Sequence, residues 1–301
     1  MNSCTVHFLG PLQVAWDKGE PPRFRSQRTM SLLGYLAAER RPVSRDALAG
    51  LFWPDEPQSK GKANLRRELH NLGNILPACW EADRQTVEFV PTAETRVDIY
   101  QLLDLEGAEQ WWAAAELVQG EFLEGVCLED NLEFETWLLG ERERWRQRVE
   151  RVLRRAVGEA ASAGENARAL RFARQLLQLM PWHEQMHRRV MELLARQGQR
   201  SAALRQYEQC KTVLDEELGV KVSAETRALY EQIRDAPAFT RHNIPAATTS
   251  LIGREQELAL LRLWLEGANV RLITIAGAGG IGKTRLAMAL AQQLYEGLAI
   301  G

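Results

Sequence analysis

The sequence predicts a multidomain, mostly α-helical protein: a small α+β unit, then an all-α unit, then the start of an α/β unit. Short β-type runs and turn pairs frame the helix signals of residues 1–97, whereas residues 98–236 carry almost only helix signals. A linker follows, and after it a glycine-rich loop lies between an apolar run and an amphipathic helix. The charge changes along a similar division: residues 1–97 hold 13 Lys and Arg against 11 Asp and Glu, residues 98–240 hold 19 against 25, and residues 241–301 hold 6 against 4.

The bulk composition narrows the class of protein. With 301 residues, 45% hydrophobic and 26% charged, the chain has the composition of a soluble globular protein with room for two domains or more. A net charge of −2 excludes a uniformly basic nucleic-acid coat but allows a local basic face. The four cysteines lie far apart without a CxxC pair, and neither a signal peptide nor an apolar run of 18 residues is present. We therefore expect a cytoplasmic protein with reduced thiols and no membrane span.

The first unit begins with strands and continues with capped helices. Gly10-Pro11 separates two β-type runs, and Ser26 and Ser44 stand where helix N-caps are expected. A proline at position 54 ends the second helix, and the turn 83–85 joins two strands of a hairpin. The expected elements are strands 5–9 and 12–16, helices from Ser26 to about 38, over 45–52 and over 59–76, and hairpin strands 80–82 and 86–90.

The third helix, Ser59–Leu76, has one apolar and one cationic face. At 100° per residue, its leucines 65, 69, 72 and 76 fall within about 60° of one another. Arg and Lys read guanine or hold phosphates, and Asn can pair with an adenine edge. A solvated helix face is the alternative interpretation. The predicted DNA-contacting residues are Lys60, Lys62, Asn64, Arg66, Arg67, His70 and Asn71 on this helix, and Arg84 at the hairpin tip.

The order sheet, three helices, hairpin is that of a winged helix-turn-helix, whose third helix enters the major groove while the wing touches the neighbouring backbone. The segments that carry a further resemblance are Phe8–Val14, Pro42–Asp46, Leu51–Pro54 and Ala63–Arg67. They resemble the DNA-binding domain of SARP-type bacterial regulators. The resemblance implies promoter DNA as the partner, with direct-repeat sites bound by two protomers.

The all-α unit contains an internal repeat. Gly164, Ala169 and Leu170 recur as Gly198, Ala203 and Leu204, an offset of 34 residues that is typical of tetratricopeptide helical hairpins. From residue 98 to 236 the chain resembles the bacterial transcriptional activation domain of SARP-type regulators, which implies contact with RNA polymerase. The segments that carry this resemblance include 120–125, 133–137, 141–144, 198–207, 216–220 and 225–230.

A linker rich in Pro and small polar residues, 237–249, leads to the start of a third unit, 250–301. Gly277, Ala278, Gly279, Gly280, Ile281, Gly282, Lys283 and Thr284 fit the phosphate-loop pattern GxxxxGK[ST]. Backbone N–H groups at glycines approach phosphate closely, Lys283 can reach the β- and γ-phosphates, and the Thr284 hydroxyl can hold Mg²⁺. The run 270–276 reads as the preceding strand and Arg285–Tyr295 as the following helix. The sequence therefore predicts a site for ATP or another nucleoside triphosphate with Mg²⁺.

The segment around Arg254, together with this loop, resembles the start of the NB-ARC/STAND group of signalling ATPases. The resemblance implies that Arg254 lies near the adenine and that the nucleotide controls the protein. Residues 1–301 offer no acidic strand to hold Mg²⁺ or orient water, so we expect no catalysis from them alone. A completed domain, built with the protein's own C-terminal domains beyond residue 301, would be a possible ATPase.

Two other patterns have simpler explanations. His183 and His187 belong to the letters H-E-x-x-H, the pattern of zinc proteases, but no third ligand is evident, and we expect the surface of a repeat helix. The carboxylates at 129, 130, 133 and 135 are expected to be solvated or to form salt links between domains.

The sequence thus predicts a winged-helix domain over 1–97, a helical activation domain over 98–236, the linker, and the truncated start of an α/β P-loop NTPase fold. The function this favours is a DNA-binding transcriptional activator under nucleotide control. The alternative is a signalling P-loop NTPase whose N-terminal half is a protein-interaction scaffold without DNA binding.

Overall fold

The computed structural model describes residues 3–17, 19–235, 253–266, 273–277 and 282–300. The chain divides into two compact units, Met1–Ala236 and Pro237–Gly301, which are treated separately below. None of the helices in these ranges is both long enough and apolar enough to cross a bilayer.

A three-stranded sheet opens the first unit. Its strands, in spatial order, are β2 (Gln13–Trp16), β1 (Cys4–His7) and β6 (Thr95–Val97). β1 pairs antiparallel with β2 and parallel with β6, and Val6 lies opposite Val14. Because β6 comes last in this part of the chain, the sheet joins both ends of the α+β part. The two N-terminal strands were predicted from sequence and β6 was not.

The helices and hairpin of this part agree with the predictions. The Ser26 hydroxyl accepts from the N–H of Thr29, and the Ser44 hydroxyl accepts from that of Asp46, so both are the N-caps that the sequence indicated. The elements are α1 (Gln27–Glu39), β3 (Val43–Ser44), α2 (Arg45–Phe52), α3 (Gln58–Ile75), β4 (Trp80–Ala82) and β5 (Thr86–Phe89), with β3, β5 and β4 forming a second small sheet. This is a winged helix-turn-helix arrangement in which β4 and β5 form the wing.

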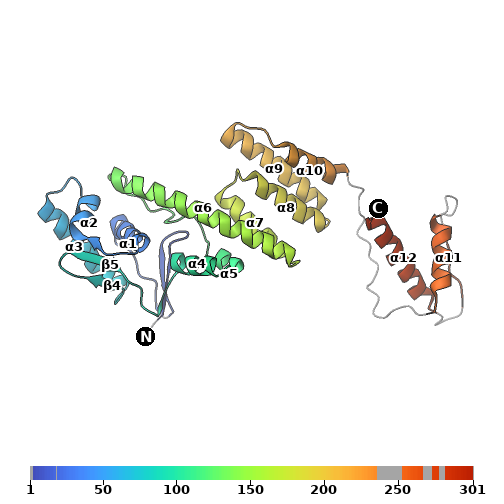
Figure 1. The fold of residues 1–301 in the computed structure, drawn as a ribbon, viewed down its shortest axis with the longest axis horizontal. Coiled ribbons are helices and arrows are strands. Elements are labelled where there is room, and N and C mark those ends of the chain that lie inside the picture. The colour runs from blue at the N-terminus through green and yellow to red at the C-terminus, as the bar shows by residue number, and fades with distance from the viewer. Residues whose placement is uncertain (1–2, 18, 236–252, 267–272, 278–281, 301) are drawn as a thin grey trace. The chain divides into compact units, whose positions relative to one another are not determined.

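The rest of the first unit is helical, as predicted. Helices pack in sequence, α6 on α7, α7 on α8 and α8 on α9 (Figure 1). The 34-residue repeat is confirmed in the backbone: Gly164 and Gly198 both adopt positive φ, 77° and 70°, in the turns before α7 and α9. Ala169 and Ala203 are both fully buried. The helices are α4 (Asp98–Gly107), α5 (Trp111–Glu116), α6 (Leu132–Ser162), α7 (Asn166–Leu179), α8 (Glu184–Arg196), α9 (Arg200–Leu218) and α10 (Ala224–Asp235).

The winged helix and the helical part share one continuous hydrophobic core. The chain at Phe8–Gly10 lies against loop 119–124: the N–H groups of Gln119 and Gly120 both donate to Leu9 O at 2.9 Å. The buried Asp98 carboxylate accepts from the N–H groups of Phe8 and Leu9, at 2.7 and 2.8 Å. Gly10 has φ of 139° where it crosses Gly120, a conformation that favours glycine.

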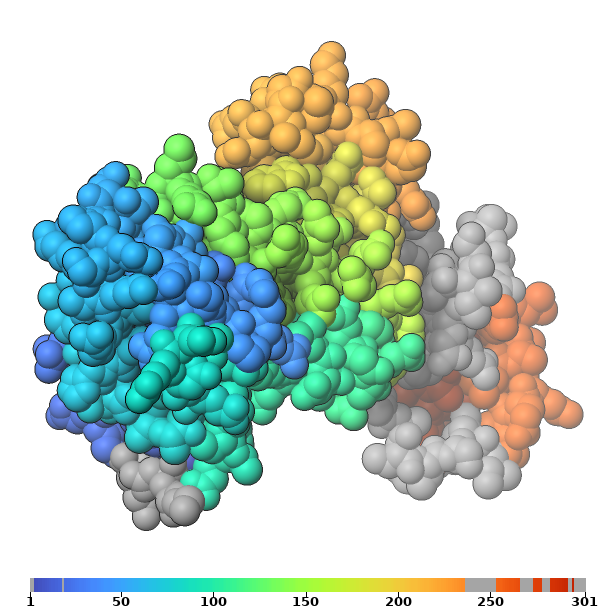
Figure 2. Space-filling view, turned by 60° about the vertical axis from the view of Figure 1, so that its left-hand side comes forward, coloured from blue at the N-terminus to red at the C-terminus, as the bar shows by residue number. Residues whose placement is uncertain are grey.

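Aromatic side chains extend this junction along α6. Tyr35 of α1 and Trp137 of α6 have ring centroids 4.7 Å apart, and Phe52 of α2 and Phe134 of α6 have centroids 5.3 Å apart. In Figure 2 the blue atoms of the winged helix and the green atoms of α6 pack directly against one another. The predicted division between residues 97 and 98 therefore lies inside one packed unit.

The second unit contains α11 (Glu255–Glu266) and α12 (Lys283–Ile300). The helix predicted after the phosphate loop is thus present. The two helices share a small apolar core of Leu258, Leu261, Leu286 and Leu290.

The predicted strand over residues 270–276 is not found where the structure describes the chain. Residues 270–272 lie outside the described ranges, and residues 273–276 have no strand structure. A strand requires a hydrogen-bonded neighbour, and no other described residue between 253 and 300 provides one. The two isoleucines of the segment, Ile273 and Ile275, pack instead against the core of α11 and α12.

Candidate nucleic-acid interface

Helix α3 exposes most of the cations that the sequence assigned to DNA. Lys60, Arg66, Arg67 and His70 are exposed, and Lys62 is half-buried. The opposite face of the helix is fixed in the core. The polar face is therefore carried on a helix whose orientation is held by burial rather than by surface contacts. Two further predicted residues also reach the surface: Asn64 on α3 is half-buried, and Arg84 on the wing is exposed.

One predicted DNA contact, Asn71, is wrong. Asn71 is only 8% exposed, and its amide donates to Glu68 Oε2 at 3.3 Å. Glu68 is itself buried and accepts from the Thr29 hydroxyl of α1 at 2.6 Å. The buried arc of α3 is rotated toward Glu68 by roughly 50° from the leucine stripe. The reason is that Glu68 finds a hydrogen-bond donor in α1 and Ile75 adds apolar surface on the same side.

Acidic neighbours hold both lysines of α3. Lys60 Nζ lies 2.8 Å from Glu56 Oε1, and Lys62 Nζ lies 2.6 Å from Asp46 Oδ1 of α2. Arg67 Nε lies 3.4 Å from the buried Glu68. Arg66 and His70, by contrast, make no hydrogen bond or ion pair with any residue that the structure describes. These two side chains are ready to contact a ligand, whereas each lysine must first leave its carboxylate partner.

The wing is a tight turn tied to the start of α2. Asp83 Oδ1 accepts from the N–H groups of Thr86 and Gln85, both at 2.6 Å, and these bonds hold the pKa of Asp83 below its ordinary value. Arg45 Nε donates to Asp83 O at 2.9 Å. Arg84 at the tip is exposed and has no partner among the described residues. The turn thus presents one cation on a rigid hairpin.

A second surface of interest lies where α6 begins. Leu132 and Leu139 are 84% and 64% exposed, and because they are seven residues apart they lie on the same face of the helix. We call these two residues the α6 patch. A shallow depression of about 800 Å³ beside it is lined by Pro54 and Asp55 of the α2–α3 loop and by Asp130, Asn131, Leu132, Glu133, Thr136, Trp137, Gly140 and Arg144.

The H-E-x-x-H letters do not form a metal site. His183 is the N-cap of α8, and its Nδ1 accepts from the N–H of Met186 at 3.2 Å. The buried His187 uses both ring nitrogens, Nε2 at 2.7 Å from Pro181 O and Nδ1 at 2.7 Å from the Gln206 amide. Burial lowers the pKa of His187, which favours the neutral ring in this position. Neither histidine therefore offers a nitrogen in the geometry of a zinc protease.

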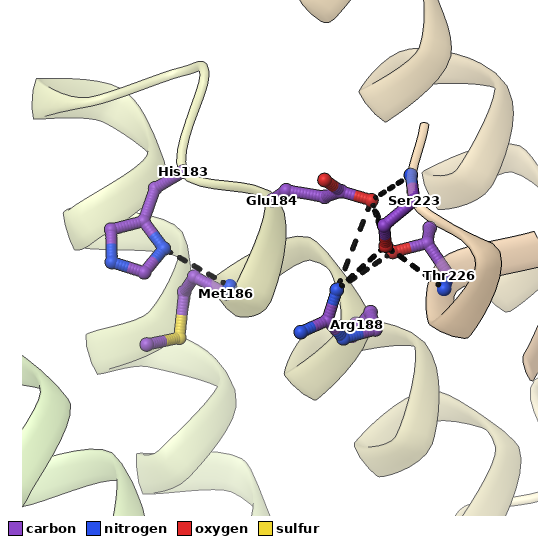
Figure 3. Close-up of polar contacts among 6 residues, drawn as sticks. All are labelled: His183, Glu184, Met186, Arg188, Ser223 and Thr226. Carbon is purple, nitrogen blue, oxygen red and sulfur yellow. Dashed lines mark hydrogen bonds and ion pairs between the residues drawn. The ribbon is translucent and has the colours of Figure 1, made fainter. Parts of the chain in front are cut away.

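Glu184, the acid of the same letters, faces helix α10 instead (Figure 3). Its Oε1 accepts from the N–H and the hydroxyl of Ser223, both at 2.7 Å, and from the hydroxyl of the buried Thr226 at 2.5 Å. Arg188 donates to the Ser223 and Thr226 hydroxyls. These residues connect two helical hairpins, so the repeat helix is structural, as expected. The expectation of a surface position is wrong for His187, which is buried because both its ring nitrogens have partners inside the unit.

The other carboxylate cluster also has structural partners. Asp130 forms an ion pair with Arg28 of α1 at 2.6 Å, and Glu135 accepts from the N–H of Leu128 at 2.5 Å. Within the described ranges, no group of three or more His, Cys, Asp or Glu side chains is placed to hold a metal ion. The expectation of salt links between the two parts of the unit is thus met at Asp130.

The phosphate loop is described only in part, because residues 278–281 lie outside the described ranges. Gly282 adopts φ of 88°, Lys283 begins α12, and Lys283 Nζ donates to Gly277 O at 2.9 Å. Thr284 is exposed in the first turn of the helix. Arg254 Nη1 lies 3.2 Å from Glu257 Oε1 at the start of α11. Binding of ATP and Mg²⁺ by these residues stays a prediction.

Comparison with known proteins identifies the helical part. Residues 104–234 match the family model of the bacterial transcriptional activator domain. This matching segment is called the activator domain below. The match covers α5 to α9 entirely, nearly all of α10 and only the last four residues of α4, so the activator domain is the part of the first unit that carries the repeat and the α6 patch.

Two curated relatives extend the likeness beyond the activator domain. The regulatory protein AfsR of Streptomyces griseus is 27% identical over 323 residues, and that of Streptomyces coelicolor is 26% identical over 325 residues. Each alignment covers 95% of this chain and 32% of the relative, so the chain spans about a third of the length of these proteins.

A solved structure, EmbR of Mycobacterium tuberculosis in complex with a low-affinity phosphopeptide, matches with a TM-score of 0.53 and 20% identity. The match covers 78% of this chain and 65% of that one, and it shows similarity of fold. The chain is thus similar to bacterial regulatory proteins in sequence and to EmbR in fold.

Proposed function

We propose that the protein is a transcriptional activator that binds double-stranded promoter DNA through α3 and the wing. The observation that carries the proposal is the outward face of α3. There, Arg66 and His70 bond to none of the described residues and stand on a helix that is fixed in the core. A winged helix-turn-helix presents its third helix to the major groove and its wing to the adjacent backbone.

The charges of this surface set a measurable salt dependence. Five cations belong to it: Lys60, Lys62, Arg66, Arg67 and Arg84. If each neutralises one phosphate, the slope of log K against log salt is about −4.5, which corresponds to a loss of affinity of about 500-fold between 50 and 200 mM salt. Glu56 and Asp46 already pair with the two lysines and compete with phosphate for them, so the measured slope should be somewhat shallower.

The test uses residues 1–301 and a duplex selected from a random library, with binding followed by fluorescence anisotropy at several salt concentrations. Arg66→Ala should reduce the slope by about 0.9, and Arg67→Ala should weaken binding by about 1–3 kcal/mol. Arg154→Ala, which removes an exposed arginine of α6, is the matched control. Binding that does not depend on salt, or equal effects of Arg66→Ala and the control, would refute the assignment. An absence of DNA binding would favour the scaffold alternative.

We propose further that the activator domain contacts RNA polymerase through the α6 patch. What supports this is the exposure of Leu132 and Leu139 beside the α2–α3 loop. In transcription assays with purified polymerase, Leu132→Lys should remove activation and leave DNA affinity unchanged. Unchanged activation would eliminate this surface. Two protomers on a direct repeat, as the SARP resemblance implies, would appear as two successive shifts of one DNA probe.

The proposed control element is the phosphate loop with ATP and Mg²⁺. The positive φ of Gly282 and the start of α12 at Lys283 support it, since a helix N-terminus favours phosphate. In this proposal Lys283 binds the β- and γ-phosphates, Thr284 binds Mg²⁺, and Arg254 lies near the base. Lys283→Ala should reduce ATP binding by a protein that contains the loop, and the fragment 1–240, which lacks the loop, should bind DNA with the same affinity with and without ATP. ATP binding that survives this change would exclude the loop as the site.

A further inference from the structure

A small cavity lies where loop 119–126 passes over α6 and the end of α7. Its volume is about 340 Å³, which is within the range of pockets for small ligands. The floor is apolar, because Phe122, Trp145, Val149 and Met180 are each less than 10% exposed. The rim is polar and consists of Glu121, Glu124, Arg146 and Gln178.

One carboxylate of this rim has no counter-charge. Arg146 pairs with Glu143 of its own helix at 2.7 Å, and Glu121 lies 3.4 Å from Arg142. The Glu124 side chain makes no hydrogen bond or ion pair with any residue that the structure describes. The cavity therefore combines an apolar floor with a single uncompensated negative charge at its mouth.

The loop backbone leaves room for that charge. A Cβ atom at position 120 would overlap Oε2 of the exposed Glu124, so glycine at this position allows the carboxylate to lie beside the loop. Below it, the rings of Phe122 and Trp145 are stacked, with centroids 5.7 Å apart and an interplanar angle of 18°. Arg142 donates to the carbonyls of Phe122 and Leu123 from the other side of the loop. Both the apolar wall and the loop are thus held before any ligand arrives.

We propose that this cavity binds a small organic cation, namely a primary ammonium group on a short aromatic or aliphatic body. The ammonium group would donate to the Glu124 carboxylate, and the body would replace water against Phe122 and Trp145. A charge-assisted bond of this kind is roughly twice as strong as one between neutral groups, so charge dominates the choice of ligand. An anionic ligand of the same shape is repelled by Glu124.

The position of the loop connects this site to the winged helix. The N–H of Leu123 donates to Phe8 O at 2.8 Å, and the N–H of Glu124 donates to Gly10 O at 3.0 Å. A ligand on Glu124 stabilises the same loop that carries these two bonds. Occupancy of the cavity therefore strengthens the attachment of the N-terminal strands to the activator domain, whether or not DNA binding is as proposed above.

The test compares three probes of one shape on residues 1–301: benzylamine, benzyl alcohol and benzoate. Titration calorimetry should show binding of benzylamine, with benzyl alcohol at least tenfold weaker and benzoate undetectable. Glu124→Gln should weaken benzylamine by at least tenfold. Glu129→Gln changes an exposed carboxylate that does not line the cavity; it is the matched control and should have no effect. Gly120→Ala displaces the carboxylate without removing it and should weaken benzylamine as well.

Hydrogen exchange supplies the second measurement. Benzylamine should slow exchange of the Leu123 and Glu124 amides in the parent protein and have no effect in Glu124→Gln. Equal binding of benzylamine and benzyl alcohol, or unchanged binding in Glu124→Gln with a native circular dichroism spectrum, would overturn the site. Unchanged exchange at the two amides while benzylamine binds would overturn the connection to the N-terminal strands.

Discussion

Asp98 is the residue whose loss should most weaken the junction between the winged helix and the activator domain. Its side chain is fully buried and accepts three backbone N–H bonds, from Phe8 at 2.7 Å, Leu9 at 2.8 Å and Ile99 at 2.7 Å. Asp98→Ala leaves three buried donors without acceptors. Each costs about 1–3 kcal/mol, and because the three are neighbours the costs do not add fully. We expect a loss of about 3–5 kcal/mol in the free energy of unfolding.

The measurement is urea unfolding of residues 1–301 followed by tryptophan fluorescence, with Asp104→Ala, an exposed carboxylate of the same helix, as control. Hydrogen exchange at the Phe8 and Leu9 amides should accelerate in Asp98→Ala and not in the control. A loss below about 1 kcal/mol, or unchanged exchange at both amides, would refute the role of this carboxylate.

The same residue makes a prediction about pH. Burial raises the pKa of Asp98 above its ordinary value, although the backbone hydrogen bonds oppose the shift. A raised folded-state pKa means that the folded protein holds this proton more tightly than the unfolded chain does. The stability that Asp98 confers relative to Asp98→Asn should therefore be greatest below the unfolded pKa of about 3.9 and fall as pH rises through the folded pKa. A difference that grows with pH would contradict the direction of the shift.

Three further outcomes follow from the same contacts. Glu68→Ala removes the acceptor of the Thr29 hydroxyl and should cost about 1–3 kcal/mol in urea unfolding, whereas Glu68→Gln, which keeps an acceptor oxygen, should cost less. Burial raises the pKa of Glu184, but its hydrogen bonds from Thr226 and Ser223 outweigh burial and leave the pKa lowered. The stability that Glu184 adds should therefore be present above about pH 4.5 and be lost as pH falls through the lowered pKa. If the free energy of unfolding of Glu184→Gln varied with pH in the same way as that of the parent protein, this prediction would be contradicted. Burial raises the pKa of the Cys210 thiol to about 12. A thiol reagent at pH 8 should therefore modify the exposed Cys127 quickly and leave Cys210 unmodified in the folded protein. Fast modification of both cysteines would show that α9 is less well packed than described.

Local patterns predicted most of the winged helix because its signals lie within a few residues of one another. The N-caps Ser26 and Ser44, the proline at 54 and the turn at Asp83 are all found where the sequence placed them. The strand β6 was not predicted, since three residues between a loop and a helix carry no periodicity. Its identity depends on parallel pairing with β1, about 90 residues earlier.

The sequence predicted which charged residues α3 carries, but it did not predict correctly which of its polar side chains face outward. A helical wheel built on leucines treats each charged residue as outward, and Glu68 does not fit that assumption because Thr29 from another helix satisfies its carboxylate. Asn71 follows Glu68 into the core for the same reason. Likewise, the pattern H-E-x-x-H could not predict the partners of Glu184, because Ser223 and Thr226 lie 35 or more positions later in the sequence.

The packed junction along α6 also has a consequence for promoter architecture. With Phe8–Gly10 hydrogen-bonded to loop 119–124, and Tyr35 and Phe52 packed on α6, helix α3 and the α6 patch belong to one compact unit. On the proposed function, the direction in which the patch projects from the double helix is then set by where the operator begins. Moving the operator by half a helical turn, about 5 base pairs, would turn the patch to the far side of the DNA, while a full turn would restore its direction. A protein with a hinge between its two parts would tolerate either displacement, and this one has hydrogen bonds and aromatic rings where such a hinge would have to be.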